Sequence, residues 1–168
     1  MGSSASISAL LKLALASAMA LLVVAPVAAA IEGEDPRHEY RERVEPICAA
    51  NTKANSRILK GIKTQVQQGK LRPAGRRFIR ASGALGKSVR QIAGVARPEA
   101  DAAKLTKWIG YLKSEKQFLF LIGKALKSGN KFKAQKLAVK LNRNNNRANN
   151  TVISFGFKEC RIDSSKFI

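Results

Sequence analysis

Few of the residues that usually carry enzyme chemistry occur in this sequence. Its 168 residues include one histidine and two cysteines, and only 11 acidic residues accompany 31 lysines and arginines. It contains no Cys-x-x-Cys pair, no nucleophile-elbow motif and no glycine-rich phosphate loop. These absences argue against an enzyme. We therefore predict no catalytic residue and no cofactor, and we identify no small-molecule substrate.

Aromatic residues and strand-like patterns are scarce as well. One tryptophan, two tyrosines and seven phenylalanines are present, and a hydrophobic core needs most of them. Recognition of single-stranded nucleic acid by base stacking is therefore poorly supported. No stretch of useful length alternates apolar and polar residues as a half-buried strand does. The chain is predicted to be all-α.

Residues 1–30 have the layout of a secretory signal peptide. Lys12 is their single cation, no acid occurs among them, and an apolar run from Leu13 to Ala25 follows. Ala28 and Ala30 then form the small-x-small pattern that a signal peptidase recognises. We expect cleavage after Ala30 and a secreted or extracytoplasmic protein. The alternative is an uncleaved membrane anchor, although the 18 residues from Leu13 to Ala30 are slightly fewer than the ~20 that a spanning helix needs.

The remaining residues, 31–168, are strongly basic. They hold 30 lysines and arginines and all 11 acids, a net charge of +19. Such a charge favours anionic partners: an envelope polymer, an anionic lipid surface or nucleic acid. The alternative is a solvated basic surface that only keeps the protein soluble. The charge does not define the oligomeric state.

Apolar residues at spacings of three and four predict a first helix. It starts at Asp35-Pro36, an N-cap followed by proline, and its apolar face runs from Tyr40 to Val66 before Gln67-Gln-Gly69 ends it. Pro46 interrupts the pattern, so the first turns are expected to kink or to form a separate short helix.

Three more helices follow. The second starts near Pro73 and carries four glycines, which either weaken it or allow a neighbouring helix to approach closely. The third has its apolar stripe from Leu105 to Leu126 and stops at Gly129, and the fourth runs from about Lys131 to Ser154. Short turns between four amphipathic helices predict an antiparallel up-down four-helix bundle. We expect one domain, 31–168, with loose ends at 31–35 and 161–168.

Cys48 and Cys160 are predicted to form a disulfide. In an up-down bundle the start of the first helix and the end of the last lie at the same end, and these cysteines lie near those two points. An exported chain is in a compartment where disulfides persist. The alternatives are two free thiols or an intermolecular bridge.

Two short segments, each containing one of the cysteines, are similar to segments of a known group of proteins. They are Tyr40–Asn51, which includes Val44-Glu-Pro-Ile-Cys48, and Gly156-Phe-Lys-Glu-Cys160 near the end. Together they resemble uncharacterised small exported helical proteins of actinobacteria, with one cysteine in the first helix and one near the C-terminus. The resemblance implies a disulfide-tied helical domain and brings no active site with it.

Basic residues are aligned along three of the predicted helices. Rows of this kind could follow a phosphate-rich polymer, with an affinity that falls steeply with salt. The candidate polyanion-binding residues are Lys133, Lys136, Lys140, Arg143 and Arg147 on the fourth helix, Arg76, Arg80 and Lys87 on the second, and Lys53, Arg57 and Lys60 on the first. The alternative is that these residues are only the solvent-exposed face of a basic helix and bind no ligand.

Three other features allow more than one interpretation. Phe118–Ile122 is apolar all round, which indicates either deep core or an exposed contact of a protein-interaction or chaperone-like module. Asp35, His38 and Glu42 share a helical face, but one histidine among exposed carboxylates is weak evidence for a metal ion, so no metal site is predicted. Asn51, Asn55 and Asn145 lie on inward faces, where they could form an amide layer between the first and last helices.

Overall fold

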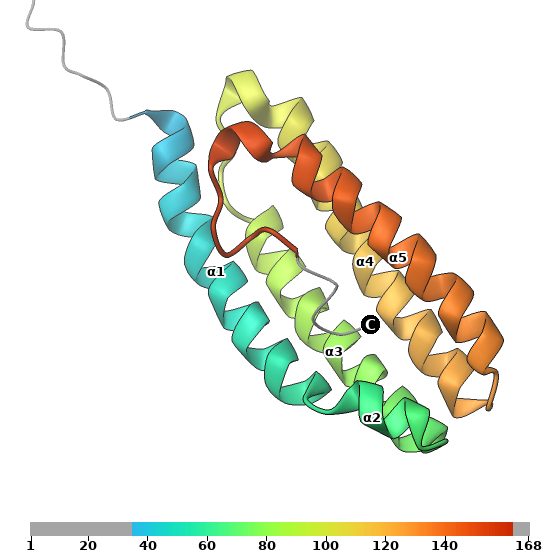
Figure 1. Cartoon of the computed structure of the whole chain (residues 1–168). Coiled ribbons are helices and arrows are strands. Elements are labelled where there is room, and N and C mark those ends of the chain that lie inside the picture. Colours follow the sequence, from blue (N-terminus) through green and yellow to red (C-terminus); the bar gives the residue numbers. More distant parts are fainter. Residues whose placement is uncertain (1–34, 163–168) are drawn as a thin grey trace, which may run out of the picture. The chain divides into compact units, whose positions relative to one another are not determined.

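The computed structural model describes residues 35–162, and the predicted signal peptide lies outside them. This part of the chain is helical throughout, without a strand (Figure 1). It comprises four long helices, a short helix between the first two of them, and two 3₁₀ turns, one before α4 and one after α5. Their bounds are α1 Pro36–Leu59, α2 Ile62–Gln67, α3 Leu71–Ala93, η1 Glu99–Asp101, α4 Ala102–Lys127, α5 Lys131–Thr151 and η2 Ile153–Phe155.

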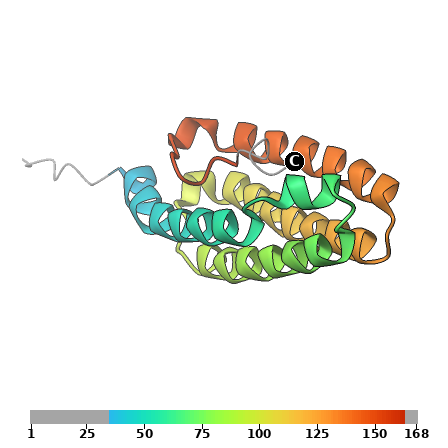
Figure 2. The same ribbon diagram turned by 60° about the horizontal axis from the view of Figure 1, so that its bottom comes forward.

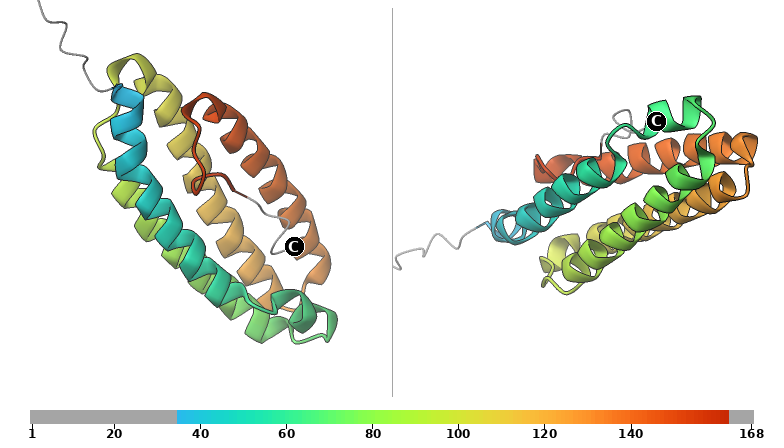
Figure 3. Two further views of the ribbon diagram at one scale, coloured as in Figure 1. Left: turned by 60° about the vertical axis from the view of Figure 1, so that its left-hand side comes forward. Right: turned by 90° about the horizontal axis from the view of Figure 1, so that it is seen from below.

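The long helices pack in chain order. α1 lies against α3, α3 against α4 and α4 against α5, with neighbours antiparallel (Figures 1 and 2). This confirms the predicted all-α up-down bundle. α1 and α5 make at most marginal contact, and the segment that follows η2 runs back between them (Figure 3). The last side of the bundle is thus closed by the C-terminal segment.

The predicted apolar stripes form the core. Phe78, Leu85 and Ile92 of α3 are buried, as are Leu105, Trp108, Leu112 and Leu126 of α4. At the end where α1 begins, the rings of Trp108 and Phe157 stack with centroids 5.3 Å apart, and Phe155 stacks on Phe157 at 5.5 Å. Since aromatic side chains bury large apolar areas, this stack fixes the turn at η2 to the bundle.

α1 differs from the prediction at two points. The helix passes through Pro46 without ending, so the separate short helix that was one of the two expected outcomes does not form, and the proline itself is exposed between the buried Val44 and Cys48. It ends at Leu59, because Gly61 has a left-handed φ of 72°, and α2 begins after it. Arg77 of α3 donates to the backbone oxygens of Ile58 and Lys60 and so satisfies carbonyls that the helix end leaves free.

The predicted disulfide between Cys48 and Cys160 is present. Cys48 lies in the middle of α1, however, and not near its start, since Pro46 does not divide the helix. Cys160 reaches it because Gly156, with a φ of 64°, reverses the chain after η2. The carboxylate of Glu45 accepts hydrogen bonds from the backbone N–H groups of Lys158 and Glu159, so α1 holds the returning segment at three consecutive residues.

The end of the returning segment is also held. The Asn149 side chain donates to the backbone oxygen of Ile162 and accepts from its N–H, both at 2.9 Å. Of residues 161–168, which we expected to be loose, 163–168 lie outside the described residues, and Ile162 is tied to α5 by this pair. Asp35, expected in the loose N-terminal end, caps α1 by accepting a 3.0 Å hydrogen bond from the N–H of Arg37.

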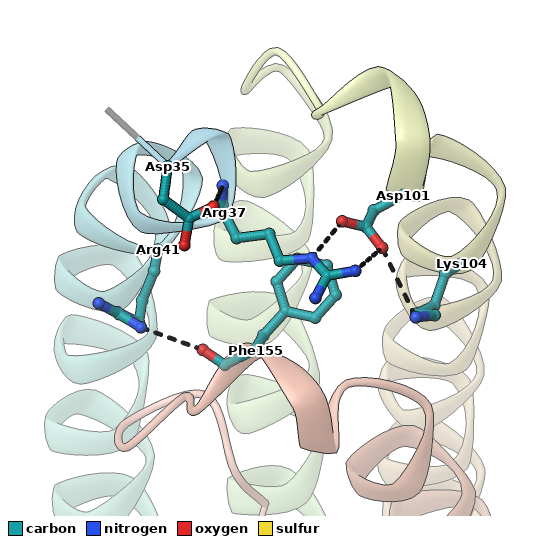
Figure 4. Close-up of polar contacts among 6 residues, drawn as sticks. All are labelled: Asp35, Arg37, Arg41, Asp101, Lys104 and Phe155. Atoms are coloured by element: carbon teal, nitrogen blue, oxygen red, sulfur yellow. Dashed lines mark hydrogen bonds and ion pairs between the residues drawn. The ribbon is translucent and has the colours of Figure 1, made fainter. Parts of the chain in front are cut away.

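An ion pair between the half-exposed Arg37 and the buried Asp101 joins the first turn of α1 to the start of α4. Arg37 donates from Nε to one carboxylate oxygen of Asp101 at 2.6 Å and from Nη2 to the other at 2.9 Å (Figure 4). Its guanidinium also lies 5.4 Å from the centre of the Phe155 ring. The hydrogen bond from Arg37 holds the pKa of Asp101 below its ordinary value. Asp101 therefore stabilises the fold at neutral pH and loses this contribution as the pH falls.

α3 and α4 cross at a pair of glycines. A Cβ atom on Gly75 would lie 2.5 Å from the backbone oxygen of Gly123, and one on Gly123 would lie 2.7 Å from that of Gly75. Gly83 has no atom within 4 Å of its Cβ position, although it lies in the same helix as Gly75. Gly75 thus allows the neighbouring helix to approach closely, whereas Gly83 has no such role and is a site where glycine only weakens the helix.

Alanine substitutions at these two glycines should have opposite effects. Gly75→Ala is expected to lower the free energy of unfolding by about 1–3 kcal/mol, because the helices must separate to admit the methyl group. Gly83→Ala should raise it by up to about 1 kcal/mol, since alanine is the better helix former and the site is open. Urea unfolding of the two variants tests this. Equal effects at both positions would contradict the close packing of α3 on α4.

Candidate functional site

All five residues of the basic row on α5 are exposed. Lys133, Lys136, Lys140, Arg143 and Arg147 all lie on the solvent side of the helix, and none forms an ion pair with an acid in the described part of the chain. At 1.5 Å per residue, the row spans about 21 Å. Lys136 lies 4.3 Å from the centre of the exposed Phe132 ring, so the row includes one cation–π contact. The side chains are free to meet an external anion.

The other two rows lie on a different pair of helices. Lys53 and Arg57 of α1 and Lys60, just after its end, are exposed, and so are Arg76, Arg80 and Lys87 of α3. α1 packs directly on α3, but α5 packs on α4 and makes at most marginal contact with α1. The structure therefore places six of the eleven predicted residues on neighbouring helices and five on α5. It does not join them into one row.

The apolar turn Phe118–Ile122 belongs mainly to the core. Leu119 and Ile122 are buried, Phe118 and Leu121 are half-buried, and Phe120 is the exposed member at 38%. One exposed ring offers little area for a protein partner.

On the acidic face of Asp35, His38 and Glu42, Asp35 has a structural role. Asp35 caps α1, while His38 and Glu42 are exposed. The residues that the structure describes contain no group of three side chains suited to hold a metal ion.

A pocket with several polar side chains on its lining, which the sequence did not predict, lies under the returning segment. It has a volume of about 130 Å³ and is bounded by α1, α3, α4 and the Cys48–Cys160 disulfide. Its polar lining comprises Asn51, Thr52, Asn55 and Ser56 of α1, Ser88 of α3, Glu115 of α4, and Glu159 and Arg161 of the C-terminal segment.

Glu115 is the unusual residue in this pocket. Its side chain is buried, and its Oε2 atom has no hydrogen-bond partner among the described residues. Desolvation raises the pKa of its carboxyl group to about 8, so the group is mostly protonated at neutral pH. The signal for it was in the sequence, because Glu115 lies three residues after Leu112 and four before Leu119, within the apolar stripe of α4.

The buried asparagines do not form the predicted amide layer. Asn55 donates to Asn51 one turn earlier in α1 at 3.2 Å, and Asn144 donates to the backbone oxygen of Tyr111 in α4 at 2.9 Å. The Oδ1 atom of Asn145, which is 1% exposed, has no partner within residues 35–162. The amides therefore bond within α1 and from α5 to α4, and no described hydrogen bond joins them across α1 and α5.

These features define a small helical bundle that is closed by a disulfide-anchored C-terminal segment and carries a basic surface. No helix between residues 35 and 162 has the length and apolar character needed to cross a membrane. Comparison of the chain with protein-family models, with curated proteins and with solved structures found no match. The resemblance to exported actinobacterial proteins stays a prediction.

Proposed function

We propose that this protein is exported and binds anionic polymers or surfaces by charge, without catalysis. The observation that carries the proposal is the exposed row on α5, whose five cations are aligned and form no ion pair with a described acid. An envelope polymer, an anionic lipid surface and nucleic acid all present closely spaced negative charges that such a row could follow. The Cys48–Cys160 disulfide is consistent with an extracytoplasmic location.

A salt series with charge-reversal variants tests the proposal. The purified, oxidised protein should bind an immobilised polyanion with an affinity that falls steeply as salt rises. In the triple variant Lys136→Glu, Lys140→Glu, Arg143→Glu, the binding should be lost. With duplex DNA as the polyanion, removal of three phosphate contacts should also lower the slope of log affinity against log salt by about 3.

The matched control reverses three exposed lysines of α4, Lys107, Lys113 and Lys124, and changes the net charge by the same amount. It should retain most of the binding, because the α5 row is intact. Equal loss in both triple variants would mean that net charge alone attracts the polymer. Weak binding, or binding indifferent to salt, would overturn the proposal and favour the alternative of a protein-interaction module.

A further inference from the structure

An apolar groove lies at the end of the bundle that α2 covers. It has a volume of about 270 Å³, close to the lower end of the range for small-molecule sites. Four helices contribute to it, and its apolar lining consists of Ile62 and Val66 of α2, Phe78 of α3, Ile122 and Leu126 of α4, and Ala134 and Ala138 of α5.

The groove forms between the short helix α2 and two alanines of α5. α2 is a six-residue helix between Gly61 and Gly69, both with a φ of 72°, and it packs mainly on α3. Across from α2, α5 presents Ala134 and Ala138, whose small side chains leave the space between the two helices unfilled. Figure 2 shows α2 lying beside the first half of α5 at this end.

The charged residues of the groove are of one sign. Lys63 of α2 and Lys131 of α5 line it, both are exposed, and none of its lining residues is an acid. The other polar lining residues are Gln67 and Gln135, which are neutral. A narrow apolar slot with cations on its lining is complementary to a molecule that has a hydrocarbon chain and an anionic head.

We propose that this groove binds a single-chain fatty acid, with the chain between α2 and α5 and the carboxylate at Lys63 and Lys131. The chain would cover Val66 and Ala138, which are only half-buried. The inference is independent of the proposed function, because neither Lys63 nor Lys131 belongs to the basic rows.

Calorimetric titration of the purified, oxidised protein with octanoate, decanoate and dodecanoate, each below its micelle concentration, tests the proposal. Affinity should rise by about fourfold for each methylene that enters the groove and stop rising when the groove is full. The methyl esters should bind about tenfold more weakly, since they lack the charge that two exposed lysines attract. Affinity that does not depend on chain length, or equal binding of acid and ester, would overturn the proposal.

Variants locate the site. Ala138→Phe fills the groove from a half-buried position and should weaken dodecanoate binding by at least about tenfold, which is the loss of two to three buried methylenes. Ala103→Phe, at an exposed site of α4, is the control and should bind normally. The double variant Lys63→Glu, Lys131→Glu changes only exposed side chains and should weaken binding of the acids but not of the esters.

The two proposals can fail separately. The triple reversal on α5 should leave dodecanoate binding unchanged, and Ala138→Phe should leave salt-dependent polyanion binding unchanged. Dodecanoate binding that survives Ala138→Phe would place the ligand elsewhere and overturn the groove assignment. A dimer in sedimentation that Ala138→Phe dissociates would give the groove to a second copy of the chain and would also overturn it.

Discussion

Reduction of the Cys48–Cys160 disulfide is expected to lower the free energy of unfolding by about 5 kcal/mol. The bridge spans 112 residues, and in the chain-entropy model so long a loop greatly restricts the unfolded chain. Domains of this size are stable by about 5–15 kcal/mol in total, so the loss is a large share. For the 128 residues of the described range 35–162 it corresponds to a fall in Tm of roughly 15–20 °C. Thermal unfolding with and without a reducing agent measures it.

The double variant Cys48→Ser, Cys160→Ser is the control for the reductant. It should unfold at the temperature of the reduced protein and should not respond to further reducing agent. The Glu45 hydrogen bonds to the backbone at Lys158 and Glu159 remain in this variant, so the returning segment keeps a second attachment. A fall in Tm of only a few degrees would mean that this attachment, with the aromatic stack, holds the segment without the bridge.

The helices that the sequence predicts well are those whose stripes are strong and whose ends carry glycine. α4 is the clearest case, because apolar residues recur at helical spacing from Leu105 to Leu126, with Glu115 as a polar exception, and Gly129 follows. The sequence did not predict the break between α1 and α2, because the apolar pattern does not stop there. Ile62 stays in phase with the stripe of α1 across the gap, so the period continues where the helix does not, and only Gly61 marks the end.

The arrangement of the candidate sites depends on contacts between distant residues, which periodicity does not specify. Helical spacing predicts that Lys136, Lys140 and Arg143 share a face, but not that α5 is separated from α1 by the returning segment. That segment is directed by the turn at Gly156 and by Glu45, a residue with no local signal for this role. The groove likewise arises where Ala134 and Ala138 happen to face α2.

Glu115 should make the protein less stable as the pH rises, in contrast to most acidic groups. Burial raises the pKa of its carboxyl group to about 8 from an ordinary value of 4.5. The folded protein therefore holds a proton that the unfolded chain releases between these two values. The stability that goes with the bound proton is fully present below pH 4.5 and is lost as the pH rises through 8. The loss amounts to about 3 kcal/mol by pH 7 and about 4–5 kcal/mol by pH 9.

Glu115→Gln tests this directly, because glutamine has the same shape and stays neutral. The variant should match the parent protein near pH 4 and exceed its free energy of unfolding by about 3 kcal/mol at pH 7, with a larger gap at pH 9. Urea unfolding at the three pH values measures the gap. The control Glu99→Gln, at an exposed glutamate, should show no such widening. The stability that the Arg37–Asp101 pair loses at low pH is lost equally in the parent protein and in Glu115→Gln, so it cancels when the two are compared. A gap that stays constant with pH would mean that Glu115 is ionised in the folded protein, and the pocket beneath the disulfide would then have to supply a partner for its charge.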